Sequence, residues 1–429
     1  MTPEIKQRIE QICRGEVPDG YKKGKLGIVP EEWNETSFST LFTSTSDYTD
    51  DLDTYPLYSL TIEDGITPKT ERYERSHLVK KEDSYKIVRP NDYAYNPMNL
   101  RFGAVARHKG DMPVAVSGYY DIFTTVFESD LPFMDSFLTF GPMITYYNRV
   151  STGSLVEKQR VHFSQFLEFM LPLPSINERT KIAAILTTQD KVIELKEKRL
   201  AEKQRQKKYL MQQLLTGKKR LPGFNGAWKV DRLGKLFLER KETNYEGLQM
   251  LAITGAQGII PRKELDLKDN SSEDKSKYLR VCVGDIGYNT MRMWQGVSAY
   301  SDYEGIVSPA YTILKPSSSI NAKYFAYLFK TPEIIFLFYR FSQGLVDDTR
   351  NLKYENFKKI KVCYPPDTKE QTAIAEVLSA ADREIGLLRQ DIEQEKQKKK
   401  ALVQLLLTGI VRVKTCRKKK CRNIPSKNC

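Results

Sequence analysis

The sequence is poor in the residues that most often carry metal-dependent or nucleophilic chemistry. It has only three histidines, His77, His108 and His162, and none lies in a His-Glu-x-x-His or Cys-x-x-Cys context. A zinc site or a histidine-based triad therefore has almost no candidate ligands or bases. Paired catalytic carboxylates and a nucleophile-elbow motif are also missing. We expect no catalytic residue, no metal site and no cofactor bound by this chain.

Cysteines and long apolar runs are scarce as well. The six cysteines are Cys13, Cys282, Cys363, Cys416, Cys421 and Cys429. Such scattered cysteines predict reduced thiols instead of a disulfide framework. No stretch approaches 18 consecutive apolar residues, and residues 1–10 carry charges throughout. The sequence thus predicts neither a membrane span nor a secretory signal, and we expect a cytoplasmic protein.

Basic residues outnumber acidic ones. The 429 residues include 68 lysines and arginines against 54 aspartates and glutamates, which gives a formal net charge of +14. Hydrophobic residues make up 40% of the chain, enough for folded cores, and the length suggests two or three domains. The excess positive charge favours an acidic polymer as partner, nucleic acid before a membrane surface, although solubility alone also accounts for it.

The chain contains an internal repeat. A shift of 192 residues aligns residues 174–221 with residues 366–413 without a gap. The positions of the first copy that are identical in the second include Pro174, Glu178, Thr180, Ile182, Ala183, Leu186, Asp190, Ile193, Leu195 and Leu214. Each copy follows a proline-containing loop and ends at a glycine, Gly217 or Gly409. Between the loop and this glycine the first copy has no proline or glycine, and the second has only Gly386. Each copy therefore predicts one long helix.

Apolar residues recur at multiples of seven positions within both predicted helices. They are Leu186, Ile193, Leu200 and Leu214 in the first copy and Leu378, Ile385, Ile392 and Leu406 in the second. This spacing predicts a coiled-coil seam, which Lys207 and Lys399 interrupt. From Glu178 to Leu215 such a helix spans about 57 Å. We favour packing of the two helices against each other; burial of the helices in two separate cores is the alternative.

The segments before and between these helices are also related, at shifts of 191 to 195 residues. Residues 33–42 resemble residues 228–237, and Tyr95-Asn96-x-Met98 recurs as Tyr288-Asn289-x-Met291. Short β-rich runs occur in both segments, together with a helical stretch. We therefore expect one α+β fold that is used twice.

Two α+β domains alternating with two long helices on a basic chain resemble the specificity subunit of type I restriction-modification systems. The most specific pieces are the proline-rich loops with the helix starts (171–190 and 364–382) and the helix ends (214–220 and 406–409). The resemblance covers residues 20–413. It implies two target-recognition domains related by a pseudo-two-fold repeat, separated by two long helices that form an antiparallel coiled coil. In that family each domain reads one half of a split DNA sequence, and the helices dock methyltransferase subunits.

By this resemblance the chain is a non-catalytic subunit that binds double-stranded DNA and two methyltransferase subunits. S-adenosylmethionine is expected in the methyltransferase partners, and ATP and Mg²⁺ in partner restriction and translocase subunits. A coiled-coil scaffold with two protein-interaction domains is the alternative, and an autonomous methyltransferase or nuclease is a third option. Asn96-Pro97-Met98 is similar in part to the Asn-Pro-Pro-aromatic loop of adenine methyltransferases, but its repeat Asn289-Thr290-Met291 lacks the proline. We therefore assign no catalysis to it.

These patterns divide the chain into six segments. They are a short N-terminal helix with its lead-in (1–29), a first target-recognition domain (30–173), a first repeat helix for spacing and docking (174–221), a second target-recognition domain (222–365), a second repeat helix for spacing and docking (366–413) and a basic tail (414–429). The two domains differ outside their shared positions. We therefore expect two different half-sites, because identical domains related by a pseudo-two-fold axis would read a palindrome.

Three parts of the chain depart from the resemblance. The first helix begins with Glu178-Arg179, whereas the second keeps the expected Glu370-Gln371, which weakens the expectation for the first docking surface. The isoleucines of residues 5–12 resemble a shortened helix end. Residues 416–429 form a tail rich in lysine and arginine, for which we expect disorder in preference to a second DNA-binding element.

Both domains carry the basic residues that duplex recognition needs, because lysines and arginines neutralise phosphates while side chains at base edges read sequence. The candidates are Lys69, Arg72, Arg75, Lys80, Lys81, Arg89, Arg101 and Arg107 in the first domain, and Arg262, Lys263, Lys275, Lys277, Arg280 and Arg292 in the second. A solvated charged face is the alternative for more than half of them. Arg101, Arg107 and Arg292 are the candidate base readers, since arginine bonds bidentately to guanine. Because Asn96 and Asn289 recur in both domains, we expect them to shape turns.

Overall fold

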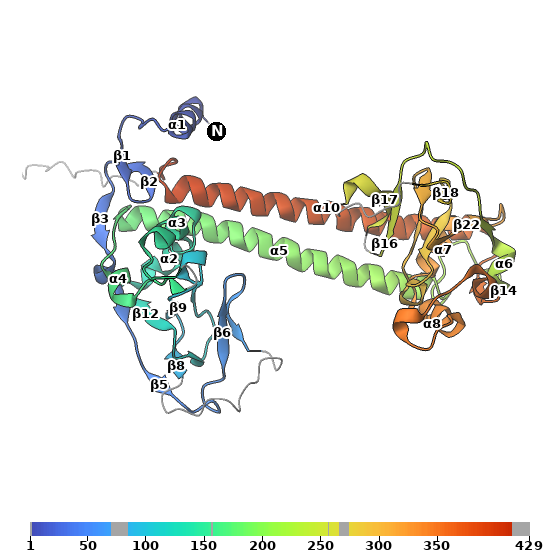
Figure 1. The fold of residues 1–429 in the computed structure, drawn as a ribbon, viewed down its shortest axis with the longest axis horizontal. Coiled ribbons are helices and arrows are strands. Elements are labelled where there is room, and N and C mark those ends of the chain that lie inside the picture. The colour runs from blue at the N-terminus through green and yellow to red at the C-terminus, as the bar shows by residue number, and fades with distance from the viewer. Residues whose placement is uncertain (1, 70–84, 156–157, 256, 266–273, 414–429) are drawn as a thin grey trace, which may run out of the picture. The chain divides into compact units, whose positions relative to one another are not determined.

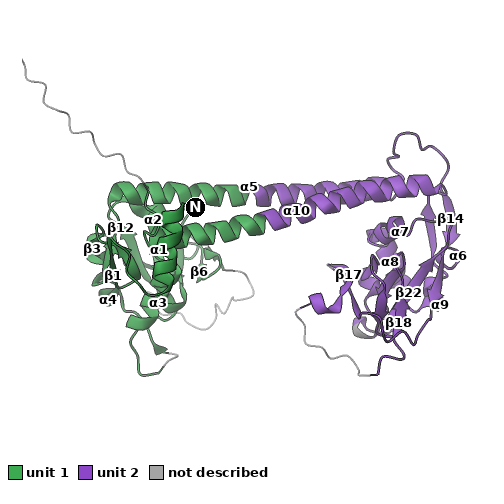
Figure 2. Cartoon of the chain, turned by 90° about the horizontal axis from the view of Figure 1, so that it is seen from above, with its two compact units in different colours: residues 1–195, 392–429 green, residues 196–391 purple. Residues whose placement is uncertain are grey.

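The computed structural model describes residues 2–69, 85–155, 158–255, 257–265 and 274–413. The chain divides into two compact units, residues 1–195 with residues 392–429 and residues 196–391, which Figure 2 shows in different colours. Each unit contains one α+β domain and a part of each of the two long helices. The expected α+β class, with two β-rich domains and two long helices, is confirmed.

The domain of unit 1 is built on antiparallel strands. Its elements are α1 (Pro3–Cys13), β1 (Tyr21–Gly24), β2 (Gly27–Pro30), β3 (Asn34–Ser37), η1 (Phe38–Thr40), β4 (Phe42–Ser44), β5 (Tyr48–Thr49), β6 (Tyr58–Thr61), β7 (Gly65–Pro68), β8 (Tyr85–Val88), β9 (Tyr93–Tyr95), η3 (Leu100–Phe102), β10 (Val105–Arg107), β11 (Val114–Ser117), β12 (Asp121–Thr125), η4 (Glu128–Asp130), α2 (Leu131–Phe137), α3 (Gly141–Val150), α4 (Phe163–Leu167) and β13 (Met170–Leu173). The largest sheet has the order β10-β9-β12-β4, beside the hairpin β6–β7 (Figure 1). Buried aromatic rings fill its core: the Phe123 ring centroid lies 5.0 Å from Phe42 and 5.2 Å from Phe166.

The domain of unit 2 repeats this plan. Its elements are β14 (Lys229–Arg232), α6 (Leu233–Leu236), β15 (Phe237–Arg240), β16 (Leu251–Thr254), β17 (Gly258–Pro261), η6 (Arg262–Glu264), β18 (Leu279–Val281), β19 (Ile286–Asn289), η7 (Met293–Gln295), β20 (Ser298–Tyr300), β21 (Gly305–Val307), β22 (Tyr311–Pro316), α7 (Ala322–Leu328), α8 (Pro332–Phe341), η8 (Asp347–Thr349), α9 (Tyr354–Phe357) and β23 (Lys361–Tyr364). Its main sheet, β15-β22-β19-β20, has the same strand order as β4-β12-β9-β10 in unit 1. Phe237, Phe325 and Phe357 are fully buried beneath it. The two domains therefore share one fold.

The long helices are α5 (Ile176–Leu214) and α10 (Thr368–Leu407), and their segments run antiparallel within each unit. In unit 1, Glu178 of α5 accepts from Arg412, just after α10, and Asp190 accepts from Lys399. In unit 2, Glu370 of α10 accepts from Arg220, just after α5, and Asp382 accepts from Lys207. Both of these ion pairs of one unit recur in the other at the shift of 192 residues, so the two lysines that interrupt the seam have matched carboxylate partners.

Both long helices end in the same way. Gly217 and Gly409 adopt positive φ angles of 71° and 70°, which glycine accepts without steric cost. The backbone N–H of Lys219 donates to the Gln213 carbonyl, and that of Val411 to the Leu405 carbonyl, so an equivalent hydrogen bond closes each helix end across its glycine. Trp228 packs on Gly217, and Trp33 packs on Gly409. Each helix end is thus fixed to the domain of its own unit.

The apolar residues at multiples of seven line the inner faces of α5 and α10 to different depths. Those that are buried are Leu186, Leu214, Leu378, Ile385, Ile392 and Leu406, whereas Ile193 and Leu200 are half-buried. Leu186 and Leu406 also belong to the aromatic core of unit 1, and Leu214 and Leu378 to that of unit 2. The portions of the helices nearest their ends therefore contribute both to the seam and to a domain core.

Candidate nucleic-acid interface

A basic residue follows the equivalent hairpin in each unit. Lys69 comes directly after β6–β7 in unit 1, and Arg262 directly after β16–β17 in unit 2. The backbone N–H of Lys69 donates to Leu57 and that of Arg262 donates to Met250, over 3.1 and 2.9 Å. The two cations therefore hold the same place relative to their hairpins, and Lys69 is exposed.

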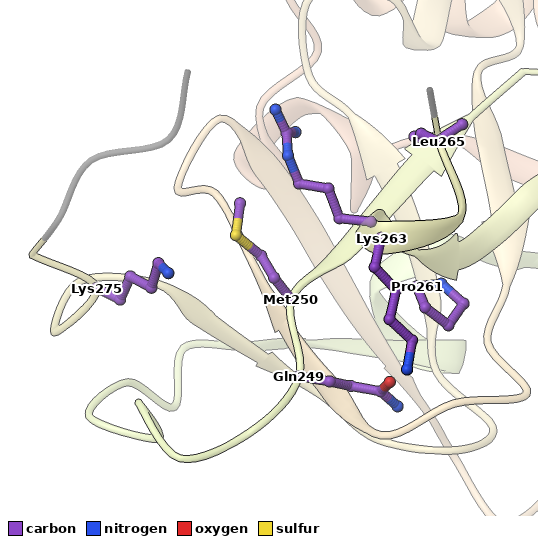
Figure 3. A pocket seen from close by; sticks show the side chains of 7 residues that line it. Gln249, Met250, Pro261, Lys263, Leu265 and Lys275 are labelled. Carbon is purple, nitrogen blue, oxygen red and sulfur yellow. The ribbon is translucent and has the colours of Figure 1, made fainter. Parts of the chain in front are cut away.

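In unit 2 this position borders an open cavity of about 400 Å³. It is lined by Gln249, Met250, Pro261, Arg262, Lys263, Leu265 and Lys275, whose side chains are drawn in Figure 3. The three cationic side chains and the one amide can donate hydrogen bonds to phosphate oxygens and base edges. The sequence alone does not indicate Gln249 as a binding residue. It stands 13 residues before Arg262, and only the hairpin brings the two together.

The asparagines of the Tyr-Asn-x-Met motifs close turns. Asn96 Oδ1 accepts from the backbone N–H groups of Met98 and Asn99, at 3.0 and 3.3 Å. Asn289 Oδ1 accepts from the backbone N–H of Met291 at 3.0 Å. The expectation that both residues shape turns is confirmed, because each side-chain oxygen accepts from the backbone of its own turn.

Arg107, a candidate base reader, is engaged within unit 1. Its Nε lies 2.9 Å from Asp135 Oδ1, its Nη2 lies 2.8 Å from Asp135 Oδ2, and its Nη1 donates to Asn91. Burial alone raises the pKa of the Asp135 carboxyl, but its hydrogen bonds from Arg107 and the charge of Lys109 hold that pKa below its ordinary value. A guanine would have to displace this forked pair before it could use the same donors.

Three more of the candidate arginines also have partners within their own units. Arg280 donates to Glu304 and Glu242 and stacks on Tyr245, with its guanidinium carbon 4.5 Å from the ring centroid. Arg101 donates to Gln159 at 3.0 Å, and Arg89 pairs with Asp47 at 2.5 Å. These side chains build the domain surfaces in the described conformation.

Other candidates are exposed and free of such contacts. Within the described ranges, the charged groups of Lys69, Lys263 and Arg292 show no hydrogen bond or ion pair. Arg292 stands just before η7, in the turn that Asn289 closes. Arg72, Arg75, Lys80 and Lys81 lie outside the described residues, as does the basic tail, 414–429. Lys69, Lys263 and Arg292 are thus among the candidates that a duplex can contact without breaking an internal bond.

The start of α5 carries Arg179 where the start of α10 carries Gln371, and the residue that contacts it differs as well. Arg179 forms a forked pair with Asp130, with nitrogen–oxygen distances of 3.0 and 2.8 Å, and both side chains are buried. In unit 2 the corresponding Gln371 accepts from the backbone N–H of Asn321 and donates to the Pro365 carbonyl. Asp130 stands at the position of Asn321, so the exchange of glutamine for arginine is matched by an exchange of asparagine for aspartate.

Among the described residues, no group of three or more histidines, cysteines, aspartates or glutamates is placed to hold a metal ion. None of the helices in the described part of the chain is both long and apolar enough to cross a bilayer.

The sequence and the fold are similar to known proteins. The family model of the type I restriction modification DNA specificity domain matches residues 234–397. A curated relative from Methanocaldococcus jannaschii, described as the specificity subunit of the type I restriction enzyme MjaX, is 24% identical over 438 residues, which cover 92% of this chain and 98% of the relative.

Solved structures share the fold. The S subunit of a type I restriction-modification system from M. genitalium matches with a TM-score of 0.53 at 14% identity and covers 90% of this chain and 99% of that chain. A chain from a study of complex assembly and conformational transition of the type I R-M system matches with a TM-score of 0.50 at 14% identity and covers 89% and 99%. Both likenesses extend over the two domains and the two long helices.

Proposed function

We propose that this chain is a DNA specificity subunit of a type I restriction-modification system, as its similarity to such subunits indicates, and that it reads an asymmetric two-part duplex sequence, one part with each α+β domain. Specificity subunits of this family are not enzymes, so the chain addresses chemistry that its partners perform. Two observations of the chain itself support the two-part target, one from the domains and one from the helices.

The observation that carries the proposal is a repeated framework with unlike surfaces. The hairpins β6–β7 and β16–β17 occupy the same place in their domains, but Lys69 follows the first and Arg262 with Lys263 the second. In the turns that Asn96 and Asn289 close, Asn99 stands in unit 1 where Arg292 stands in unit 2. Because different side chains on one frame present different donors to the major groove, each domain reads a different half-site.

The repeated helices support docking of a partner that is present in two copies. The ion pairs Glu178–Arg412 and Glu370–Arg220 occupy the same place in their units, and so do the two helix ends. A chain with an internal repeat offers two equal surfaces to two identical partners. We assign these partners as two methyltransferase subunits, and α5 with α10 as the element that fixes the gap between half-sites. Residues inserted between Leu200 and Leu210 then change the gap and leave each half-site intact.

The cofactors of the reaction belong to the partners in this proposal. S-adenosylmethionine is bound by the methyltransferase subunits, and ATP with Mg²⁺ by restriction subunits that translocate and cut unmodified DNA. A subunit that addresses chromosomal DNA works in the cytoplasm.

Selection from a random-sequence duplex pool tests the proposal. The chain is purified with its methyltransferase partner, bound duplexes are sequenced, and the affinity for the enriched sequence is measured against salt. The expected result is a split motif and an affinity whose logarithm falls linearly with the logarithm of salt concentration, because phosphate contacts release counterions. A stable complex that enriches no sequence and shows no salt dependence contradicts the proposal and favours the coiled-coil scaffold.

A further inference from the structure

A second basic concavity lies in unit 2, outside the hairpin region. It is an open basin of about 820 Å³ between β14, α6 and the chain from α9 to β23. Figure 2 shows β14, α6 and α9 near one another. Its lining residues, here called the lysine basin, are Val230, Asp231, Arg232, Gly234, Lys235, Lys358, Lys359 and Lys361. Five of these eight residues are cationic and one is anionic.

Most of the positive charge in the lysine basin is uncompensated. Asp231 already accepts from Lys235 at 3.0 Å and from the Tyr364 hydroxyl at 2.9 Å, and these hydrogen bonds lower the pKa of its carboxyl. Lys358 pairs with Glu355 outside the basin. In the part of the chain that the structure describes, Arg232, Lys359 and Lys361 have no carboxylate within ion-pair distance. Three exposed cations therefore share one concavity.

Two of these cations are direct cross-strand partners. Arg232 of β14 lies opposite Lys361 of β23 in the antiparallel ladder, and both side chains are exposed. Like charges directly opposite each other destabilise a strand pair. A bound anion offsets this repulsion, which gives the arrangement a physical reason.

The cations of the lysine basin do not recur at the equivalent positions of unit 1, all of which the structure describes. The equivalent strands are β3 and β13, in which Ser37 lies opposite Met170, at the positions of Arg232 and Lys361. Glu168 stands at the position of Lys359. A surface for a partner that docks twice would recur in both units, so the occupant of the lysine basin is met by unit 2 alone.

We propose that the lysine basin binds the phosphate backbone of duplex DNA next to the half-site that unit 2 reads. The inference rests on the proposed function, because it takes that duplex as the ligand. Lysine ammonium groups are point charges that suit phosphates and carry no base readout, so the basin adds affinity without sequence preference. Unit 2 thereby holds its DNA over a wider footprint than unit 1 does.

The test compares the salt dependence of binding for matched variants of the complex with the methyltransferase partner. The basin variant is Lys359→Gln with Lys361→Gln; the control variant, Lys23→Gln with Lys25→Gln, removes the same charge from exposed lysines of unit 1. On a duplex with flanking base pairs beside the second half-site, the log–log salt slope of the basin variant should be smaller by about 2 than that of the wild type. The control variant, and Lys359→Arg with Lys361→Arg, should keep the wild-type slope.

The duplex length identifies the source of the effect. On a duplex that ends at the half-site, the wild type and the basin variant should have equal slopes. Equal slopes on the flanked duplex, with the sequence preference intact, overturn the lysine basin as a phosphate site and leave the proposed function standing. Weaker methyltransferase binding with unchanged slopes overturns it in favour of a protein contact. A wild-type complex without sequence preference fails the proposed function itself.

Discussion

Units 1 and 2 hold the starts of α5 and α10 with different chemistry. In unit 1 a buried ion pair, Arg179 with Asp130, ties the helix to the domain, whereas in unit 2 neutral hydrogen bonds of Gln371 do so at Asn321. The residue just before each of these, Glu178 or Glu370, forms the same ion pair, to Arg412 or to Arg220. The comparison teaches that the repeat preserves the position of the helix start, while the residues that secure it have changed in pairs.

The largest effect is expected from breaking the tie in unit 1. Arg179→Ala leaves Asp130 buried and unpaired, which should lower the free energy of unfolding by about 3–5 kcal/mol. Arg179→Gln combined with Asp130→Asn recreates the arrangement of unit 2 and should recover most of that loss. Urea titration of the three proteins checks this, and a double variant as unstable as Arg179→Ala would show that the two units are not interchangeable here.

A smaller difference in stability is expected between variants at the helix ends of the two units. An alanine Cβ at Gly409 would come within 2.5 Å of Pro30 Cγ and 2.8 Å of Trp33, whereas at Gly217 the nearest Trp228 atoms are 3.3 Å away. Both positions also have positive φ. Gly409→Ala should therefore cost about 2–3 kcal/mol and Gly217→Ala about 1 kcal/mol. Equal losses in thermal unfolding would contradict the tighter packing of unit 1.

In unit 2 a half-buried lysine, Lys330, lies beside the domain core. Lys330 Nζ donates to the Gly296 carbonyl at 2.7 Å, and Thr139 stands at the equivalent place in unit 1. Burial, with the charge of Lys207 second, lowers the pKa of Lys330 to about 8. Between that value and the unfolded pKa of about 10.4, Lys330 binds more protons in the unfolded state, so its contribution to the free energy of unfolding rises with pH.

The variant Lys330→Met should abolish this rise, which is on the order of 2 kcal/mol over that pH window. Urea titrations at several pH values between about 8 and 10.5 measure it. Lys323→Met, at an exposed lysine on α7, is the control and should keep the rise. A Lys330→Met variant whose stability changes with pH as that of the wild type does would contradict the lowered pKa of Lys330.

The smallest effect concerns DNA reading by one unit. Arg292 is exposed in the turn before η7, and Asn99 takes its place in unit 1. Arg292→Ala should weaken binding by about 1–2 kcal/mol and relax one base position of one half-site. Sequencing of selected duplexes measures it. A uniform loss at every sequence would instead make Arg292 a phosphate contact.

Much of the fold could be predicted because its signals are local or repeated. The helices follow from the seven-residue spacing and the glycine ends, and the paired α+β domains from motifs that recur at a near-constant shift. The turn role of Asn96 and Asn289 followed from recurrence alone, and their hydrogen bonds confirm it.

The state of the candidate arginines could not be predicted in the same way. Arg107 meets Asp135, 28 residues away, and Arg280 meets Glu304, 24 residues away, through pairings that the tertiary fold creates. The sequence shows that a cationic side chain is present, but only the fold shows whether this side chain already pairs with a carboxylate. The lysine basin likewise joins residues near 232 and 360, which are distant in sequence and adjacent through the β14–β23 ladder.

The most direct measurement of the central claim is a map of methylated adenines in a host without background methylation. The methyltransferase partner is expressed with and without this chain, and complex formation is verified. The account predicts one new split motif that appears only when the chain is present, with two unlike halves. A confirmed complex that produces no motif, or the same motif without the chain, would contradict it.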